Sequence, residues 1–151
     1  MIPFFTTFVL ALCASVGAAR LAEAMLTHRV PVLGAFAGLE LSHNAGVAFG
    51  VRIPSPWQEL LILAALCGVA FVARREQSVL SRIAFGLIFA GALGNIIDRL
   101  PDGVVTDYVQ VGTFPIFNVA DSAITVGAGL LLAYAVFEEW KKRSGLASTQ
   151  K

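Results

Sequence analysis

Four long apolar segments divide this chain and limit what it can fold into. They run from about residue 3 to 26, 57 to 73, 83 to 97 and 119 to 137. A membrane-spanning helix needs about 20 predominantly apolar residues. The chain is 57% hydrophobic, whereas a soluble domain is about 45–50% apolar. We therefore predict an all-α membrane protein, with one domain over residues 1–151 that contains four transmembrane helices.

The basic residues predict the orientation, because cytoplasmic connections carry an excess of Lys and Arg. They gather in the connection between the second and third segments and in the C-terminal tail: Arg74, Arg75, Arg82, Lys141, Lys142, Arg143 and Lys151. Both termini are then expected in the cytoplasm, with residues 26–56 and 99–118 at the outer face. The net charge of +1 gives no electrostatic basis for binding nucleic acid.

The two outer segments contain patterns typical of short strands. Residues 38–44 alternate between apolar and polar side chains, as a half-buried strand does. Residues 104–109 are β-prone and lie between Gly103 and Gly112. We expect these stretches to form a small extracytoplasmic β-sheet at the membrane surface.

Small residues recur at four-residue spacing within two of the apolar segments. Gly86, Ala90 and Gly94 do so in the third, and Ala123 and Gly127 do so in the fourth. Such spacing lets membrane helices approach closely. It predicts tight helix packing and carries no information about chemistry.

The cysteines and histidines do not form a metal-binding pattern. Cys13 and Cys67 each lie inside an apolar run, and His28 and His43 are isolated from each other and from both cysteines. No metal site is predicted. The two cysteines are expected to be small hydrophobic residues of the packed interior.

All four aspartates fall between positions 98 and 121, beside long apolar segments. A carboxylate near low dielectric is costly unless it is paired, hydrogen-bonded or protonated, so such residues are candidates for function. Asn118 is a favoured helix N-cap, which places Asp121 in the first helical turn, where the helix dipole favours its ionised form. Asp107 can meet Asp121 if the segment between them folds back.

Two carboxylates that share one proton can carry out hydrolysis. One acts as a base on water, and the protonated one polarises a carbonyl group. Asp121 is expected to be the ionised member, although Asp107 could also be a solvated loop acid. Asp102 has the pattern of a turn residue. Arg99 is expected to orient Asp98 or another carboxylate, and Asn95 shares its helix face.

Four sequence boxes resemble those of the lipoprotein signal peptidase family, also called signal peptidase II. Residues 94–99, 103–108 and 114–124 read GNIIDR, GVVTDY and FPIFNVADSAI. Residues 43–50 read HNAGVAFG, which is similar to the family's Asn-x-Gly-x-Ala-Phe box. The resemblance covers about residues 31–136.

This resemblance implies a four-span aspartic protease of the bacterial inner membrane, with its active site at the periplasmic face. It would remove signal peptides from prolipoproteins just before a diacylglyceryl-modified cysteine, as a monomer among membrane lipids and without a cofactor. The resemblance makes Asp107 and Asp121 the catalytic pair. Asp98, next to Arg99 at a helix end, is expected to be structural. It places a short amphipathic flap with the sheet, around residues 38–56. The residues it assigns to substrate binding or to support of the pair are Asn44, Gly46, Asn95, Arg99 and Asn118.

The first apolar segment departs from the family pattern. The family usually has an Asp there, four residues before a Lys, and Val16 and Arg20 occupy these positions. Two alternatives to the peptidase are an inactive protein of the same fold and a carrier that binds cations or protons through its acids. A carrier would be expected to have acids in the middle of its spans, and the mid-spans here are acid-free.

Overall fold

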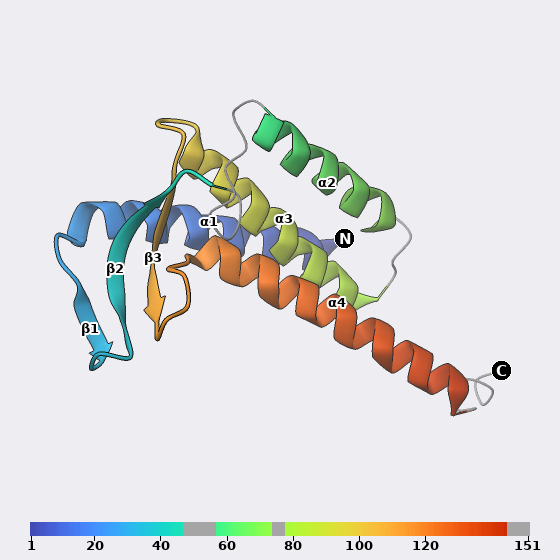
Figure 1. Cartoon of the computed structure of the whole chain (residues 1–151). Helices are drawn as coiled ribbons and strands as arrows, with labels where there is room; N and C mark the ends of the chain where they lie inside the picture. Colours follow the sequence, from blue (N-terminus) through green and yellow to red (C-terminus); the bar gives the residue numbers. More distant parts are fainter. Residues whose placement is uncertain (47–56, 74–77, 145–151) are drawn as a thin grey trace.

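The structure is a computed structural model that describes residues 1–46, 57–73 and 78–144. It consists of a body of helices with a small sheet at one end (Figure 1). The elements, in chain order, are α1 (Ile2–Met25), β1 (Val30–Leu33), β2 (Ala37–Asn44), α2 (Trp57–Ala73), α3 (Val79–Arg99), β3 (Val105–Val111) and α4 (Val119–Arg143).

The four helices occupy the four apolar segments of the sequence. α1, α3 and α4 are each long and apolar enough to cross a membrane. α2 has 17 residues, and its apolar stretch, Leu60–Phe71, is shorter than such a span. That α2 also crosses the membrane therefore stays a prediction. α3 begins before its expected start because Ser78 caps it, accepting a hydrogen bond from Ser81 N at 2.9 Å.

α3 is the central helix and packs against α1 and α4, whereas α2 has its main contact with α3. Glycines allow the close approaches. A Cβ atom at Gly86 would lie 2.8 Å from Phe4 O of α1, and one at Gly127 would lie 2.6 Å from Ala84 O of α3. These contacts confirm the tight packing predicted from the small residues. Gly91, outside that pattern, lies against α4 in the same way.

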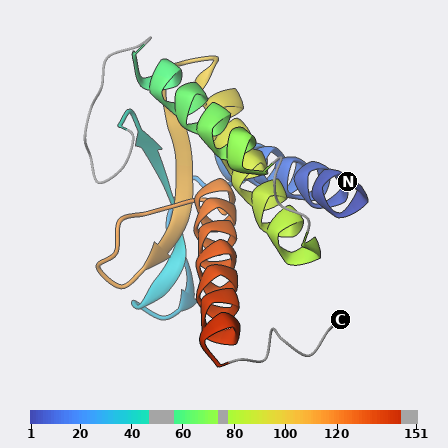
Figure 2. The same ribbon diagram turned by 90° about the vertical axis from the view of Figure 1, so that its right-hand side faces the viewer.

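The sheet is antiparallel with strand order β1-β2-β3. β2 and β3 confirm the two predicted strands, and β1 is an additional strand that the sequence pattern did not reveal. Figure 2 shows the sheet beside the start of α4. Tyr108 of β3 packs against Ala19 and Ala22 of α1, and these three residues form a buried cluster. The cluster fixes the sheet to the end of α1.

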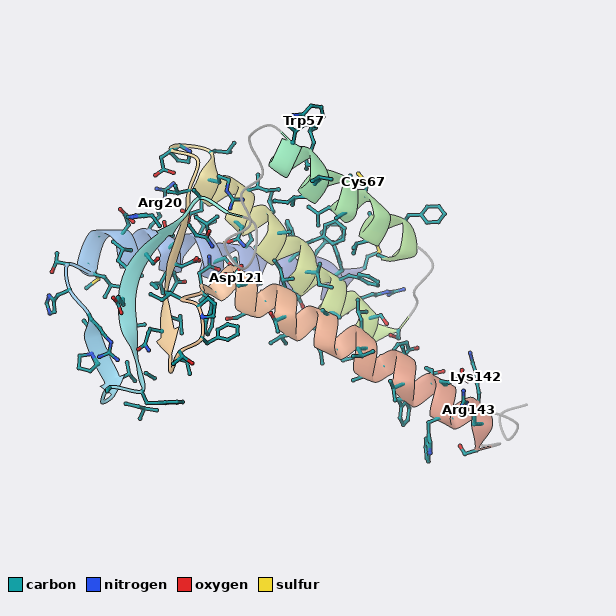
Figure 3. The ribbon with its side chains drawn as sticks, viewed as in Figure 1. Arg20, Trp57, Cys67, Asp121, Lys142 and Arg143 are labelled. Carbon is teal, nitrogen blue, oxygen red and sulfur yellow. The ribbon has the colours of Figure 1, made fainter. Side chains whose placement is uncertain are left out.

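The two cysteines lie at the surface and not in the packed interior. Cys13 and Cys67 are both exposed at the surface of their helices, so the prediction that they belong to the packed interior is wrong; Figure 3 shows Cys67 on α2, the helix with the fewest neighbours. An apolar residue on a membrane helix can face lipid, so apolarity alone did not imply burial. Most of the predicted flap, residues 47–56, lies outside the described residues.

Candidate active site

Asp107 lies in β3 and is almost completely buried, with 3% of its surface exposed. Asn44 Nδ2 donates to Asp107 Oδ2 at 3.1 Å, and Asn118 Nδ2 donates to Asp107 Oδ1 at 2.9 Å. The pKa of Asp107 is raised to about 6, chiefly by burial and also by the nearby charge of Asp121, and the hydrogen bonds from the two asparagines oppose this rise. Asp107 is therefore a carboxyl group that accepts a proton readily.

Asp121 lies in the first turn of α4, as predicted, and Asn118 is the N-cap. Asn118 Oδ1 accepts a hydrogen bond from Asp121 N at 2.9 Å, and Asp121 Oδ2 accepts one from Asn118 N at 3.3 Å. This reciprocal pair is a capping box. Asn95 of α3 donates from Nδ2 to the other carboxylate oxygen, Oδ1, at 2.8 Å. Asp121 is thus held from its own helix and from α3.

The chain between the two aspartates folds back, as the sequence analysis required. Phe117 and Val109 exchange two backbone hydrogen bonds, of 2.7 and 3.1 Å. The turn at Gly112 has a positive φ of 55°, which glycine adopts without strain. This fold-back brings the end of β3 and the start of α4 together.

The two aspartates are joined by asparagines and line the same cavity. Asn118 Nδ2 also donates to Asn95 Oδ1 at 3.1 Å, so a chain of side-chain contacts runs from Asp107 through Asn118 and Asn95 to Asp121. The cavity has a volume of about 630 Å³, and its remaining wall is largely apolar. Figure 3 shows Asp121 at the end of α4 that faces the sheet. The arrangement can place a polar reacting group between two carboxyl groups in an otherwise apolar pocket.

Arg99 and Gly46 hold Asn44 in position through two hydrogen bonds. Arg99 is buried, and its Nη2 donates to Gly46 O at 2.8 Å. Gly46 N donates to Asn44 Oδ1 at 2.8 Å. Since Asn44 in turn contacts Asp107, Arg99 acts on that carboxylate through the backbone of the segment after β2.

Asp98 contacts the backbone at the start of β3. Its Oδ2 accepts a hydrogen bond from Thr106 N at 2.6 Å. Through this contact Asp98 fixes the start of β3, one residue before Asp107. That Arg99 orients Asp98 or another carboxylate stays a prediction. Asp102 is a turn residue as predicted, accepting from Val104 N at 3.1 Å.

Sequence reasoning missed Tyr108 as a site residue. Its hydroxyl oxygen accepts a hydrogen bond from Val119 N at 3.3 Å, in the first turn of α4. Burial raises the pKa of the phenol, so it stays neutral. An aromatic residue in a strand gives no sign of such a contact. At the departure from the family pattern, Val16 is half-buried and Arg20 is exposed on α1 (Figure 3).

Comparison with known proteins identifies the family. The profile of the peptidase A8 family, described as Signal peptidase (SPase) II, matches residues 8–137. The chain belongs to the signal peptidase II family. The lipoprotein signal peptidase of Symbiobacterium thermophilum is 37% identical over 77% of this chain and 81% of its own length. That of Shouchella clausii is 38% identical over 71% of this chain and 74% of its own length.

Solved structures agree with the family assignment. A bacterial membrane enzyme determined by the in meso method is 26% identical, with a TM-score of 0.72 over 86% of this chain and 92% of that one. A second such enzyme, with a TM-score of 0.76 over 97% of this chain and 93% of the other, is 24% identical and shares the fold. The chain is therefore an integral membrane protein and a signal peptidase II family peptidase that removes signal peptides from prolipoproteins.

Proposed function

We propose that the chain is an aspartic endopeptidase in which Asp107 and Asp121 activate a water molecule. The observation that carries this proposal is the asparagine-linked pair of carboxyl groups in one cavity. Two neighbouring carboxyl groups hold a shared proton, because both cannot be ionised at low cost. The raised pKa of Asp107 supports its role as the protonated member and leaves Asp121 as the base.

The reaction would proceed through a tetrahedral intermediate. Asp121 takes a proton from water as the water oxygen attacks the scissile carbonyl carbon, and protonated Asp107 donates a hydrogen bond to the carbonyl oxygen. The intermediate collapses when a proton passes to the amide nitrogen and the C–N bond breaks. Asn44 and Asn118 keep Asp107 in place. Because water is the nucleophile, no acyl-enzyme forms.

The scissile bond would be the one just before the diacylglyceryl-modified cysteine of a prolipoprotein. The largely apolar cavity wall, which includes Ile62, Phe117 and Ile124, suits a substrate that arrives from the lipid phase. The site lies at the end of α4 opposite Lys142 and Arg143 (Figure 3). Those basic residues favour a cytoplasmic C-terminus, so the proposed site faces the periplasm from the bacterial inner membrane. In this topology α2 also crosses the membrane, and both termini are cytoplasmic. A single copy of the chain contains the whole proposed site.

The test is cleavage of a diacylglyceryl-modified prolipoprotein in proteoliposomes. We expect the parent protein to release the signal peptide, and Asp107→Asn and Asp121→Asn each to lower kcat by about 100-fold or more. Asp102→Asn, at an exposed turn, is the matched control and should retain the parent rate. Cleavage that survives either dyad substitution would refute the assignment. A parent protein that never cleaves would favour the inactive alternative.

A further inference from the structure

Two cavities lie one beyond the other along the same three helices. The first, at the dyad, is walled in part by Ile62 of α2, Ala92 of α3 and Ile124 of α4. The second has a volume of about 820 Å³ and lies between α2, α3 and α4, toward the C-terminal end of α4. The first cavity contains the proposed catalytic pair, and the second has no part in the mechanism above.

The lining residues of both cavities fall on one face of α3 and on one face of α2. On α3 they are separated by three or four positions, which is the spacing of one helical face. The spacing on α2 is similar, whereas the lining residues of α4 cover a wider part of its surface and include the consecutive Ile124, Thr125 and Val126. In order from the dyad they include Ala92, Ile88, Phe85 and Ser81 on α3, and Ile124, Leu131, Ala135 and Glu138 on α4. The two cavities are thus successive parts of one path along the helices.

The walls of the second cavity leave room for a bulky apolar partner. Gly68 of α2 lines it, and a Cβ atom at Gly68 would meet no atom within 4 Å. Ala65 and Ala135, also in the lining, are exposed in the isolated chain. α2 packs mainly on α3, and the cavity separates α2 from α4.

The path has the length of a membrane crossing. From Asp121 to Glu138, α4 rises about 25 Å at 1.5 Å per residue, against about 30 Å for the hydrocarbon core of a bilayer. At its far end the lining includes Glu138, Glu139 and Lys142. Glu139 pairs with Arg143 at 2.9 Å, whereas Glu138 has no ion pair among the residues described. Glu138 therefore lies at the end of an apolar path, and its carboxylate can contact a cationic group there.

We propose that the two cavities form one seat for the apolar segment of the substrate's signal peptide. Signal peptides carry a basic n-region followed by 7–15 apolar residues and a cleavage site. In the seat, the cleavage site lies at the dyad, the apolar segment packs against α2, α3 and α4, and the basic n-region meets Glu138. This inference rests on the proposed function, because the dyad fixes which end of the peptide lies outermost.

The first test fills the seat. Gly68→Leu adds an apolar side chain where space is open, and Gly129→Leu adds the same side chain to an exposed position of α4 outside both cavities, also with nothing within 4 Å. We expect Gly68→Leu to raise KM for the prolipoprotein about tenfold with little change in kcat, and Gly129→Leu to leave both unchanged. Equal kinetics for the two variants overturn the seat while leaving the dyad intact. A parent that does not cleave overturns the proposed function instead.

A second test does not depend on cleavage or on tolerance of the larger side chain. A benzophenone amino acid at position 135 or 129 is introduced into the Asp121→Asn protein, and the radiolabelled prolipoprotein is added in proteoliposomes. Photolysis should crosslink the signal peptide at position 135 and not at position 129. Crosslinks of equal yield at both positions, or at neither, contradict the seat.

A third test removes the negative charge of Glu138 at the far end of the seat. Glu138→Gln should raise KM several-fold for a substrate with a Lys-rich n-region, and should have no effect when those lysines are replaced by glutamine. Lys142→Gln, one turn further along α4, is the matched control and should not discriminate between the two substrates. If Lys142→Gln alone impairs cleavage, and does so for both substrates and only in vesicles containing anionic lipid, the far cavity holds a lipid headgroup and the proposal is wrong.

Discussion

Asn118 donates a hydrogen bond to Asp107 at 2.9 Å while its own side-chain oxygen caps α4 by accepting from the backbone of Asp121. One asparagine therefore fixes the helix start and a buried carboxylate of the neighbouring strand. A carboxylate at this position could not donate to Asp107, and a hydroxyl could not reach both partners.

These two roles of Asn118 can be separated by substitution. Asn118→Ala should lose about 1 kcal/mol of stability through the missing cap and should also lose most activity. Asn118→Ser keeps a capping oxygen, so its melting temperature in detergent should stay near that of the parent, while its kcat falls as far as that of the alanine variant. Equal activity of Asn118→Ser and the parent would show that the contact with Asp107 is dispensable.

Stability should depend on pH through Asp107. Its pKa rises from 3.8 to about 6 in the folded chain, so the folded state binds the proton more tightly than the unfolded state between these values. Stability should consequently be highest below about pH 4 and decline as the pH rises toward 6, with about 1.4 kcal/mol for each unit of pKa difference. Asp107→Asn cannot ionise and should escape this loss.

The measurement compares melting temperatures between pH 4 and pH 7. The difference between Asp107→Asn and the parent should grow in favour of the variant as the pH rises. Asp102→Asn, which changes an exposed turn residue, should follow the parent curve. Parallel curves for Asp107→Asn and the parent would argue against the raised pKa.

Gly91 should tolerate no side chain. A Cβ atom there would collide with the carbonyl oxygen of Ala120, the residue before Asp121. Gly91→Ala must therefore push α4 away from α3. We expect a loss of about 1–3 kcal/mol and a fall in kcat, because the displaced turn carries Asp121. Gly129→Ala, with open space around it, should instead gain up to about 1 kcal/mol. Stabilisation by both substitutions would refute the close approach.

Asp98 should act by positioning β3. Asp98→Ala leaves Thr106 N, in a buried residue, without its acceptor, which should cost about 1–3 kcal/mol and lower kcat. Asp98→Asn retains an oxygen acceptor and should recover most of both losses. Because Asp98 does not contact the scissile bond in the proposed mechanism, KM should change little in either variant. Failure of Asn to rescue the alanine defect would point to a role for the charge.

The sequence predicted those features that depend on local patterns. Apolar length predicted the helices, and an asparagine before an apolar run predicted the cap at Asn118. Alternation predicted β2, and β-prone residues between two glycines predicted β3. The four-residue spacing gave the close approach at Gly86. Each of these depends on interactions between residues near in the chain, or on one face of one element.

Features that depend on packing between distant segments could not be predicted from local sequence patterns. Asp98 and Arg99 are neighbours in sequence, yet Asp98 contacts Thr106 of β3 and Arg99 contacts the carbonyl of Gly46, which follows β2. β1 has four residues, all of them exposed, and it is defined by its pairing with β2. The exposure of Cys67 depends on which face of α2 meets α3.

The fold-back between β3 and α4 has a consequence for biosynthesis. Asp107 belongs to a strand whose partner precedes α2, and Asp121 belongs to α4, which is synthesised after β3. A nascent chain that has inserted α1, α2 and α3 therefore has one half of the acid pair and no partner for it. Under the proposed mechanism, proteolytic capability arises only once α4 has been added, so a nascent chain without α4 cannot cleave other proteins during membrane insertion.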